Sequence, residues 1–501
     1  MEGVENLDTL NKYFFGGEAE AEAEIRNDIF VPPSNLKKIL SFTRSRYKVL
    51  LGAKGVGKSL LINVLNESAL EENAISVLLT PGDFNCEDIA KKSTNSDKMS
   101  AAYNQLLNAI GSKIGQYQSG LLTSSSEINL HKLAVEDGVN KADAISEFSS
   151  FLSKVTPFAK DVAKAAMDVQ RLNKNKNILT KDIATVLKKN QQKFWVLIDD
   201  VDQAAITKQN SYDYSVCWAI VAATIQLAND FSEVRSLISV RTDIWHTMTV
   251  GKKHGSDILD KIQTPVYLRF TEEELGEVFF KRIELANKEA IGSYKRELST
   301  FFEQRTLKLP GHAESIRSWD FWIRKQSRNR PRDMIQLVQK LIEKAEDHDN
   351  DVIKAEDAYH IMLDYARERI VNIEREYREI CPQIKAIIRE LSTEKMYEFS
   401  DLIKILKAVP SSRRVIIDST VLTPDTNEAA IKILHVLHMC NFINARVETD
   451  NPDSDYDHIL FSQRPDLVSS DNWNELQRYR WEIHPVFHPY IHEMKTSTYK
   501  F

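Results

Sequence analysis

Cysteine is scarce in this chain. The four cysteines, Cys86, Cys217, Cys381 and Cys440, are scattered along the sequence and form no CxxC pair. Their spacing therefore implies neither a disulfide framework nor a cysteine-bound zinc site. It fits a reducing compartment such as the cytoplasm.

Long apolar runs are also missing. The most apolar stretch, Val216–Ala228, is shorter than the roughly 20 residues that a membrane-spanning helix needs, so it predicts a buried helix instead. The N-terminus, MEGVENLDTLNKYFF, has no basic region followed by an apolar one and does not look like a signal peptide. We therefore expect a cytoplasmic protein with no membrane partner.

An excess of positive charge is lacking as well. Lys and Arg number 66 against 72 Asp and Glu, which gives a net charge of −6. This balance argues against a protein that coats nucleic acid by its overall charge. The chain has 501 residues, of which 42% are hydrophobic and 28% charged. It can bury a sizeable core, and its length is typical of about three domains.

What the chain does contain is one sharp motif near the N-terminus. An apolar strand, Tyr47–Leu51, leads into GAKGVGKS, and an apolar helix, Leu60–Leu65, follows. This is GxxxxGK[ST] between a strand and a helix, the setting that indicates a phosphate-binding P-loop. Glycines let backbone N–H groups surround phosphate oxygens, and the helix N-terminus adds its dipole. The predicted phosphate-binding residues are Gly52, Ala53, Lys54, Gly55, Val56, Gly57, Lys58, Ser59 and Leu60.

A P-loop needs acidic partners on a second strand. The apolar run Phe194–Ile198 predicts a buried parallel strand and is followed by Asp199, Asp200 and Asp202. We expect Lys58 to reach the β- and γ-phosphates, and we expect Ser59 and Asp199 to hold Mg²⁺. Asp200 would polarise the attacking water, and Asp202 is a third carboxylate within reach. No Asn-Lys-x-Asp tetrapeptide follows a later strand, which favours ATP over GTP.

The remaining pattern divides the chain into four parts. Residues 1–45 predict a helical lead-in, in which we expect the acidic stretch Glu18–Glu24 to be helical and solvated. Residues 46–270 predict an α/β core with a parallel sheet. The distance from its second strand to Phe194 exceeds the roughly 30 residues of a βαβ unit, so we expect an insertion at about 115–180. The further strands and the helices of the insertion are expected at Ala74–Leu79, Val234–Val240, Val266–Phe270, Ala144–Val155 and Phe158–Val169.

The C-terminal half is predicted to be mainly helical. Residues 271–350 predict a helical lid, and residues 355–501 predict three helices and a hairpin, the arrangement of a winged-helix-like domain. The lid helices are expected at 271–288, 293–305, 313–326 and 331–346, and the later ones at Pro382–Leu391, Glu398–Ala408 and Glu428–Cys440, with hairpin strands at Phe442–Val447 and Ile459–Phe461.

These parts resemble known ATPase families. A P-loop, an acidic strand, a strand with a polar tip and a four-helix lid follow the order of AAA+ ATPases. Ile198–Asp202 and Ser239–Asp243 resemble signatures of KAP and STAND P-loop ATPases. Tyr13–Gly17 and Asn329–Asp333 resemble a group of soluble bacterial and cyanobacterial P-loop ATPases close to KAP. Genes of that group often sit in anti-phage defence loci. The lid and winged helix also resemble replication-initiator ATPases.

The resemblance implies that an arginine senses the γ-phosphate, and two places in the sequence offer candidates. Arg241, at a strand tip beside the acidic strand, would sense the γ-phosphate. Arg330 and Arg332 flank Pro331 at the start of a lid helix, where a cation is unfavourable unless an anion is near. We favour Arg332.

The sequence departs from these families in three ways. KAP proteins often carry inserted transmembrane segments, which this sequence lacks. Its acidic strand ends in Asp-Asp where AAA+ proteins usually have Asp-Glu, and no arginine finger is evident before Val266.

Two further patterns favour uses other than metal or DNA binding. His484, His488 and His492 recur at every fourth position, but Pro485 and Pro489 interrupt a regular helix, so a packed segment is favoured over a metal site. A winged helix suggests DNA, but phosphate contacts need Lys and Arg. The helix before the hairpin offers only Lys432 as a firm cation, and the wing carries Glu448, Asp450, Asp453, Asp455 and Asp457. Protein contacts are therefore favoured over nucleic acid.

We accordingly expect an ATP-dependent switch or motor that uses ATP and Mg²⁺. Its partners would be a protein effector and other subunits, a homo-oligomer among them. Anti-phage defence is the setting that the resemblance implies. One alternative is a DNA-binding initiator or loader of the AAA+ type. Another is a scaffold whose nucleotide is structural and barely hydrolysed.

Overall fold

The computed structural model describes most of the chain in two compact units. We call the unit of Asn35–Leu51 and Lys58–Val266 the core unit. The other, which we call the lid unit, contains Met1–Ser34, Gly52–Gly57 and Tyr267–Phe501. The described residues are 2–17, 21–43, 45–71, 74–117, 124–136, 176–190, 193–205, 213–250, 265–308, 316–391, 394–448 and 456–498.

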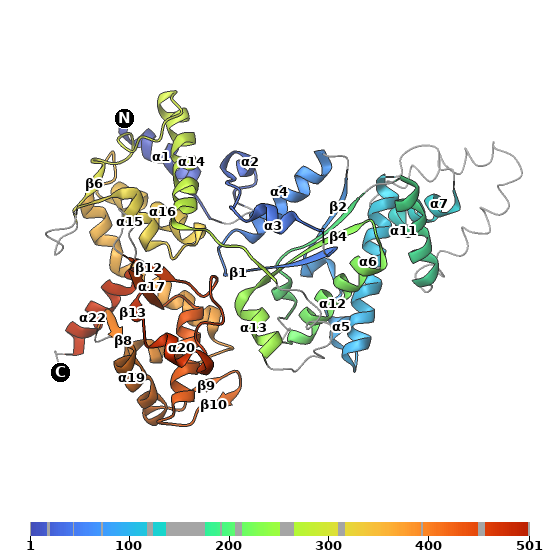
Figure 1. The fold of residues 1–501 in the computed structure, drawn as a ribbon. Coiled ribbons are helices and arrows are strands. Elements are labelled where there is room, and N and C mark those ends of the chain that lie inside the picture. Colours follow the sequence, from blue (N-terminus) through green and yellow to red (C-terminus); the bar gives the residue numbers. More distant parts are fainter. Residues whose placement is uncertain are drawn as a thin grey trace, which may run out of the picture. The chain divides into compact units, whose positions relative to one another are not determined.

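A five-stranded sheet organises the core unit, in the order β2-β3-β4-β1-β5 (Figure 1). β2 runs parallel to β3, and β3 runs parallel to β4. β4 therefore separates the P-loop strand β1 from the acidic strand β3. The strands are β1 (Tyr47–Gly52), β2 (Ile75–Leu79), β3 (Phe194–Ile198), β4 (Val234–Arg241) and β5 (Val266–Tyr267).

Helices cover both faces of this sheet. α4 packs against β2 and β3, and α6 and α12 pack against β2 and β4 (Figure 1). α12 is buried along nearly its whole length, which confirms the buried helix predicted for the most apolar stretch. The helices are α3 (Leu36–Leu40), α4 (Lys58–Glu71), α5 (Cys86–Ala90), α6 (Asn95–Tyr117), α7 (Ser125–Glu136), α11 (Lys176–Asn190), α12 (Tyr214–Asp230) and α13 (Thr242–Val250), with 3₁₀ turns η1 (Pro81–Asp83) and η2 (Val201–Ala205).

Helical packing is seen in the described part of the predicted insertion. α7 and α11 pack on each other and on α6. α6 and α7 approach closely at Gly115, where an added Cβ would lie 1.9 Å from the carbonyl oxygen of Leu130. The helices predicted at Ala144–Val155 and Phe158–Val169 lie outside the described residues.

The lid unit begins with the N-terminal helix. α1 packs against α14 and α16, and α15 packs beside the same two helices (Figure 1). α14 has a capping box at Thr271 and ends at Gly292, which adopts a left-handed φ of 67°. The elements are α1 (Glu2–Phe14), α2 (Arg26–Ile29), α14 (Glu272–Ile291), β6 (Thr306–Leu307), β7 (Arg317–Ser318), α15 (Trp319–Gln326), α16 (Pro331–Asp347) and α17 (Ala355–Tyr377).

Several predicted boundaries in this half of the chain are wrong. Residues 293–305 are not helical, because the Asn287 side chain binds the carbonyls of Lys295 and Glu297 and thereby fixes a non-helical turn. The stretch predicted at 313–326 is helical only from Trp319, and β5 ends at Tyr267 rather than at Phe270.

The acidic N-terminal stretch also differs from the prediction. Its described part, residues 21–24, forms turns rather than a helix. Glu22 is 5% exposed, not solvated, and is paired with Arg282. A buried charge needs such a partner, and the partner lies 260 residues away.

The last 118 residues from Ile384 to Phe501 include the predicted three helices and hairpin. β11 and β12 pair antiparallel, within a sheet of order β12-β11-β13-β8. The winged-helix assignment itself stays a prediction. The elements are α18 (Ile384–Glu390), β8 (Met396–Glu398), α19 (Phe399–Ser412), β9 (Ile416–Ile417), β10 (Thr420–Val421), α20 (Asn427–Met439), β11 (Ile443–Glu448), β12 (Tyr456–Ile459), η3 (Ser470–Asn472), α21 (Trp473–Leu476), β13 (Arg480–Ile483), η4 (Pro485–Phe487) and α22 (His488–Thr498).

The C-terminal histidines belong to packing. The Nδ1 of His484 accepts a hydrogen bond from the backbone N–H of Val486, and the Nε2 of His488 bonds to the carbonyl of Ile483 at 2.7 Å. His438 on α20 is fully buried and lies against the rings of Phe461 and Trp481. In the part of the chain that the structure describes, no helix combines the length and apolar character that crossing a membrane requires.

Two of these histidines are expected to make the stability of this region depend on pH. Burial lowers the pKa of His438 and of His488 to about 4, whereas an unfolded histidine has a pKa of about 6.5. Unfolding therefore takes up protons between these values, so the stability is full above about pH 6.5 and is lost as the pH falls toward about 4. The loss is on the order of 3 kcal/mol for each histidine.

Urea unfolding near neutral pH and at about pH 5 measures this dependence. His438→Phe is the comparison, because its ring cannot titrate and is close in size. We expect the variant to lose less stability than the wild type on acidification. An equally steep dependence in both proteins would contradict the role of His438.

Candidate nucleotide site

The phosphate loop connects β1 to α4 as the motif predicted. Gly55 and Gly57 have φ values of 79° and 95°, in the region that favours glycine. A Cβ at Gly55 would lie 2.9 Å from the Cβ of Arg332, so a larger residue would also clash there. Lys58 is the first residue of α4. The loop therefore has the backbone conformation that lets N–H groups turn toward an anion.

Lys58 lies among carboxylates in the core unit. Its side chain is 6% exposed. Burial lowers the pKa of Lys58, and the charges of Asp202, Asp200 and Asp199 oppose that shift. The structure thus brings the predicted lysine close to all three predicted acids. Parallel strands end at one edge of a sheet, which is why residues so distant in sequence meet here.

Asp199 and Asp200 differ in their surroundings. The hydroxyl of Ser239 donates to Oδ1 of Asp199 at 2.5 Å and accepts from the backbone N–H of Asp200 at 3.0 Å. Asp200 has a left-handed φ of 48°, a conformation that Asp tolerates better than most residues. Its Oδ2 accepts from the side-chain amide of Gln203 at 3.0 Å. The chain turns sharply after β3, so the two carboxylates point differently.

Asp202 is a buried acid with one carboxylate oxygen that lacks a hydrogen-bond partner among the described residues. It lies in η2 and is 8% exposed, and this oxygen is Oδ1. Burial raises the pKa of Asp202, although Arg241 and Lys58 oppose the rise. A buried oxygen without a partner is costly and is typical of a place where water or a ligand binds.

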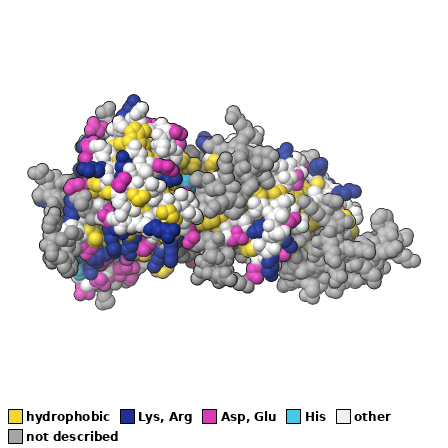
Figure 2. Space-filling view, turned by 90° about the horizontal axis from the view of Figure 1, so that it is seen from below, with side chains coloured by type: hydrophobic (Ala, Val, Ile, Leu, Met, Phe, Trp, Pro, Cys, Tyr) yellow, Lys and Arg dark blue, Asp and Glu magenta, His cyan; other side chains and the backbone are white. Residues whose placement is uncertain are grey.

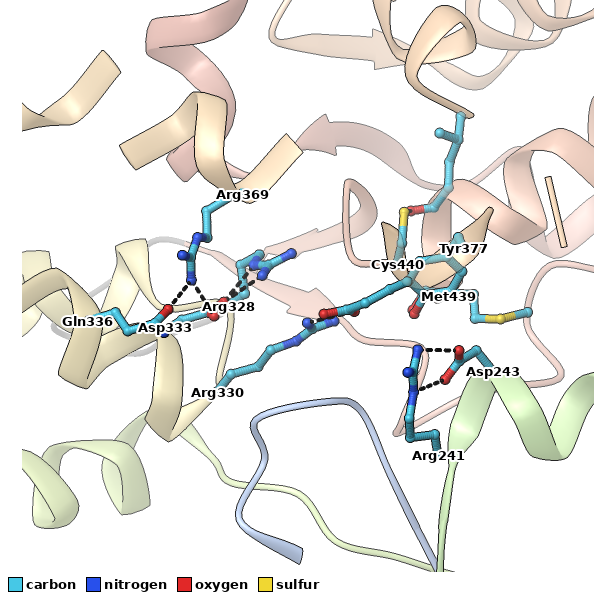
Figure 3. Close-up of polar contacts among 12 residues, drawn as sticks. Arg241, Asp243, Arg328, Arg330, Asp333, Gln336, Arg369, Tyr377, Met439 and Cys440 are labelled. Carbon is cyan, nitrogen blue, oxygen red and sulfur yellow. Dashed lines mark hydrogen bonds and ion pairs between the residues drawn. The ribbon is translucent and has the colours of Figure 1, made fainter. Parts of the chain in front are cut away.

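Arg241 ends β4 in the same unit. Its Nε and Nη2 donate to the two carboxylate oxygens of Asp243 at 3.1 and 2.6 Å, as Figure 3 shows. The sequence placed Arg241 just past the strand, whereas it is the last strand residue. As a γ-phosphate sensor it would have to share its guanidinium with Asp243.

Arg332, in the lid unit, contacts the phosphate loop directly. Its backbone N–H donates to the carbonyl of Gly55 at 3.2 Å, and its Nε donates to the carbonyl of Gly17 at 3.0 Å. It is the second residue of α16, after Pro331. Of the two arginines beside Pro331, Arg332 is thus the one that lies at the loop.

Arg330 belongs instead to a buried ionic cluster. Its Nη1 lies 3.2 Å from a carboxylate oxygen of Glu376 on α17. Asp333 is paired with Arg328 and Arg369, each at 2.7 Å (Figure 3). Burial would raise the pKa of Asp333, but these two guanidinium groups outweigh it and lower the pKa. Arg330 and Asp333 therefore tie the start of α16 to α17.

Comparison with known proteins agrees with this geometry. Residues 34–341, more than half of the chain, match the KAP family P-loop domain. The chain belongs to the KAP family. The resemblance to KAP P-loop proteins is thereby confirmed. This match covers the P-loop, the three acids, Arg241 and Arg332, so all predicted site residues of this KAP-family chain lie within the matched domain.

One curated relative matches beyond the family domain. The "Putative transposon gamma-delta 80.3 kDa protein" of Escherichia coli (strain K12) is 22% identical over 399 residues, which is 76% of this chain and 54% of that protein. The chain therefore spans about half the length of the curated relative it matches.

Solved structures with similarity include ORC and Cdc6 proteins. The Aeropyrum pernix ORC2 protein, in its ADPNP–ADP complexes, is 11% identical with a TM-score of 0.37, covering 97% of this chain and 94% of that one. Cdc6p from Pyrobaculum aerophilum is 12% identical with a TM-score of 0.31, covering 97% and 98%. Drosophila ORC bound to DNA is 10% identical with a TM-score of 0.30, covering 91% of each chain. Scores this low say nothing about how this KAP-family chain is arranged.

The residues of the core unit suit a Mg²⁺ ion. Ser59 and Asp199 offer oxygen ligands, the type that Mg²⁺ prefers. Asp199 is 6% exposed and oriented by the Ser239 hydroxyl, as a carboxylate held for a metal would be. Bound there with a nucleotide, Mg²⁺ would neutralise phosphate charge.

Two contributors to the site escaped the sequence reasoning. In the sequence, Ser239 stands out only as part of a strand tip, and β4 carries a second buried serine, Ser236. Gly17 belongs to the Tyr13–Gly17 segment that carries the family resemblance, but its contact with Arg332 joins residues 315 apart in the chain and has no local signal.

Proposed function

We propose that this KAP-family chain binds ATP with Mg²⁺, hydrolyses it, and acts as a molecular switch. The observation that supports this best is the burial of Lys58, at the start of α4, among Asp199, Asp200 and Asp202. A cation and carboxylates gathered at the end of a P-loop are the parts that phosphoryl transfer requires.

The residues would divide the work as follows. Lys58 meets the β- and γ-phosphates, and Asp199 with Ser59 holds Mg²⁺. Asp200 orients and polarises the attacking water as a general base. Arg241 and Arg332 respond to the γ-phosphate. ATP is proposed over GTP because the Asn-Lys-x-Asp tetrapeptide of the sequence, residues 140–143, lies in the predicted insertion at about 115–180 and does not follow a later strand.

Arg332 would convert the nucleotide state into a change of the lid. It holds the second position of α16, where a cation opposes the helix dipole unless an anion is near. Its backbone bonds to Gly55 of the phosphate loop. A γ-phosphate in that loop would be such an anion. ATP and ADP would then favour two different states of the lid.

Arg332→Ala tests this switch. We expect the variant to keep ADP affinity nearly unchanged, to lose the ATP-specific state and to turn ATP over more slowly. The measurement is protease sensitivity of residues 270–350 with ADP and with a non-hydrolysable ATP analogue. Wild type should show a difference between the nucleotides. A variant that keeps the full difference would show that Arg332 is not the sensor, and Arg241 would be tested next.

The C-terminal region supports a protein partner rather than DNA. Most of α20 is buried, and its cation Lys432 is already paired with Glu428 at 2.7 Å. The hairpin strands expose Glu448 and Asp457. On the face drawn in Figure 2, Lys and Arg side chains lie beside Asp and Glu side chains rather than forming one continuous basic surface. A helix buried in this way is not available to enter a DNA groove.

We therefore propose a protein effector, or further subunits of the same kind, as the partner. Bacterial anti-phage defence is the setting we propose, and it rests on the family resemblance of Tyr13–Gly17 and Asn329–Asp333 alone.

A further inference from the structure

The N-terminal segment reaches the proposed sensor arginine. We call residues 13–17 the N-terminal strap. The carbonyl oxygen of Gly17, its last residue, accepts a hydrogen bond from Nε of Arg332 at 3.0 Å. The backbone N–H of Arg332 bonds to Gly55. Arg332 therefore contacts the strap with its side chain and the phosphate loop with its backbone, all within the lid unit.

The backbone conformation of the strap favours glycine, and the Arg332 side chain packs against it. Gly16 and Gly17 have φ values of 83° and 61°, which favour glycine. A Cβ at Gly17 would lie 3.4 Å from Cγ of Arg332 and 3.5 Å from Cγ2 of Ile335. The guanidinium-bearing side chain thus packs directly on the strap backbone.

Anchors fix the chain on both sides of Gly17. Upstream, Phe14 is fully buried against Phe279, with ring centroids 5.8 Å apart, and the Tyr13 hydroxyl donates to Glu289 at 2.8 Å. Downstream, Glu22 accepts two hydrogen bonds from Arg282 at 2.8 and 3.0 Å.

Arg282 joins the two anchors. It is 2% exposed, and besides Glu22 its Nη1 also binds the carbonyl of Tyr13. Tyr13 and Glu22, which lie before and after Gly17 in the sequence, both bind this one side chain on α14. A bidentate, buried pair of this kind fixes geometry because neither partner can be solvated if the other moves.

We propose that the N-terminal strap is a positioning element for the ATP response: Gly17, held in place by the Glu22–Arg282 pair, orients the Arg332 side chain at the phosphate loop. This inference rests on the proposed function, in which Arg332 senses the γ-phosphate. An arginine side chain has several freely rotating bonds, and holding its Nε removes much of that freedom before the phosphate arrives. The strap residues touch neither substrate nor reacting atoms in this scheme.

Two variants of the full-length chain test the strap, each with a matched control. Gly17→Ala places a side chain on Arg332. Gly292→Ala imposes the same left-handed strain at φ 67° but has no atom within 4 Å of the new Cβ. Glu22→Gln removes the buried charge partner of Arg282. Its control, Glu277→Gln, removes an exposed carboxylate on α14 that pairs with Arg296 at 2.6 Å.

The readouts are the ADP-against-ATP-analogue difference in protease sensitivity of residues 270–350, kcat, and ADP affinity. We expect Gly17→Ala and Glu22→Gln to lose most of the difference and to lower kcat by roughly ten-fold, less than the ~10²-fold that a misplacement of about 1 Å can cost. ADP affinity should stay unchanged, and both controls should behave as wild type.

A double variant separates positioning from a loss of stability. Gly17→Ala combined with Arg332→Ala should lower kcat no further than Arg332→Ala alone, because the strap acts through that side chain. Thermal stability is measured on the same variants, because two residues in contact need not destabilise the chain additively. If the two kcat losses multiply instead, the strap acts by some other route and the inference is wrong.

The remaining outcomes distinguish the strap from the proposed function. If Arg332→Ala loses the nucleotide difference but Gly17→Ala keeps it, the inference fails and the proposed function stands. If Arg332→Ala keeps the difference, the proposed sensor fails and the inference falls with it. Should Glu22→Gln not fold, because a buried Arg282 is left unpaired, Gly17→Ala against Gly292→Ala decides alone.

Discussion

Replacing Lys58 by alanine is expected to remove most of the affinity for ATP. Lys58 is 6% exposed at the first turn of α4 and is surrounded by Asp199, Asp200 and Asp202. Without the lysine, the three carboxylates would face the triphosphate with less positive charge to offset them, and like charges repel strongly where water is excluded. The loss should therefore exceed that of one ordinary hydrogen bond.

Equilibrium binding of labelled ATP measures this effect. Lys92→Ala is the control, because Lys92 also lies in the core unit but makes an exposed ion pair with Asp88 at 3.1 Å, which contributes little. If Lys58→Ala binds ATP as tightly as wild type does, the P-loop is not the nucleotide site.

Replacing Asp200 by asparagine should leave nucleotide binding intact and abolish most turnover. Asparagine tolerates the left-handed φ of 48° and can still accept the hydrogen bond from Gln203. The variant therefore removes the charge and the basicity while keeping the turn. A general base contributes roughly 10²–10⁴-fold, and we expect a loss in that range.

Steady-state hydrolysis and ATP binding should be measured side by side, with Asp202→Asn as the comparison. Asp202 is the other candidate base, because its buried Oδ1 has no partner among the described residues. Burial also raises the pKa of Asp202, as suits a group that takes up a proton. Unchanged hydrolysis in Asp200→Asn together with loss in Asp202→Asn would move the role to Asp202.

The alternative of a structural nucleotide is tested by the same experiment. A scaffold that binds ATP without turnover would show slow hydrolysis in wild type and no further loss in Asp200→Asn. We propose hydrolysis because the Ser239 hydroxyl orients Asp199, and Asp200 follows it directly with a left-handed φ of 48°.

Local pattern was sufficient for the strands and for the phosphate loop. β1, β3 and β4 were predicted to within a residue or two, because a strand buried on both faces reads as a continuous apolar run. The loop was evident because its glycines, Lys58 and Ser59 all lie between residues 52 and 59 of the sequence. The family match over residues 34–341 agrees with that reading.

Longer-range contacts decided what pattern alone got wrong. Residues 293–305 have helical spacing, but Asn287 binds two of the following carbonyls and holds a turn instead. Glu22 looked solvated in an acidic run and is buried on Arg282. The Asn287 bonds reach 8 and 10 residues along the chain and the Glu22 pair spans 260 residues, and hydrophobic spacing indicates neither contact.

The sequence by itself therefore determined the class of the core, the phosphate loop and the acids opposite it, since their signals lie in neighbouring residues. Only the tertiary structure decided which arginine beside Pro331 meets the loop. Arg330 is held by Glu376, whereas Arg332 bonds to Gly55 and Gly17. In the sequence, Glu376 lies 46 residues from Arg330, and Gly55 and Gly17 lie 277 and 315 residues from Arg332. Two cations two positions apart look equivalent in sequence, and the direction in which α16 turns each of them separates their roles.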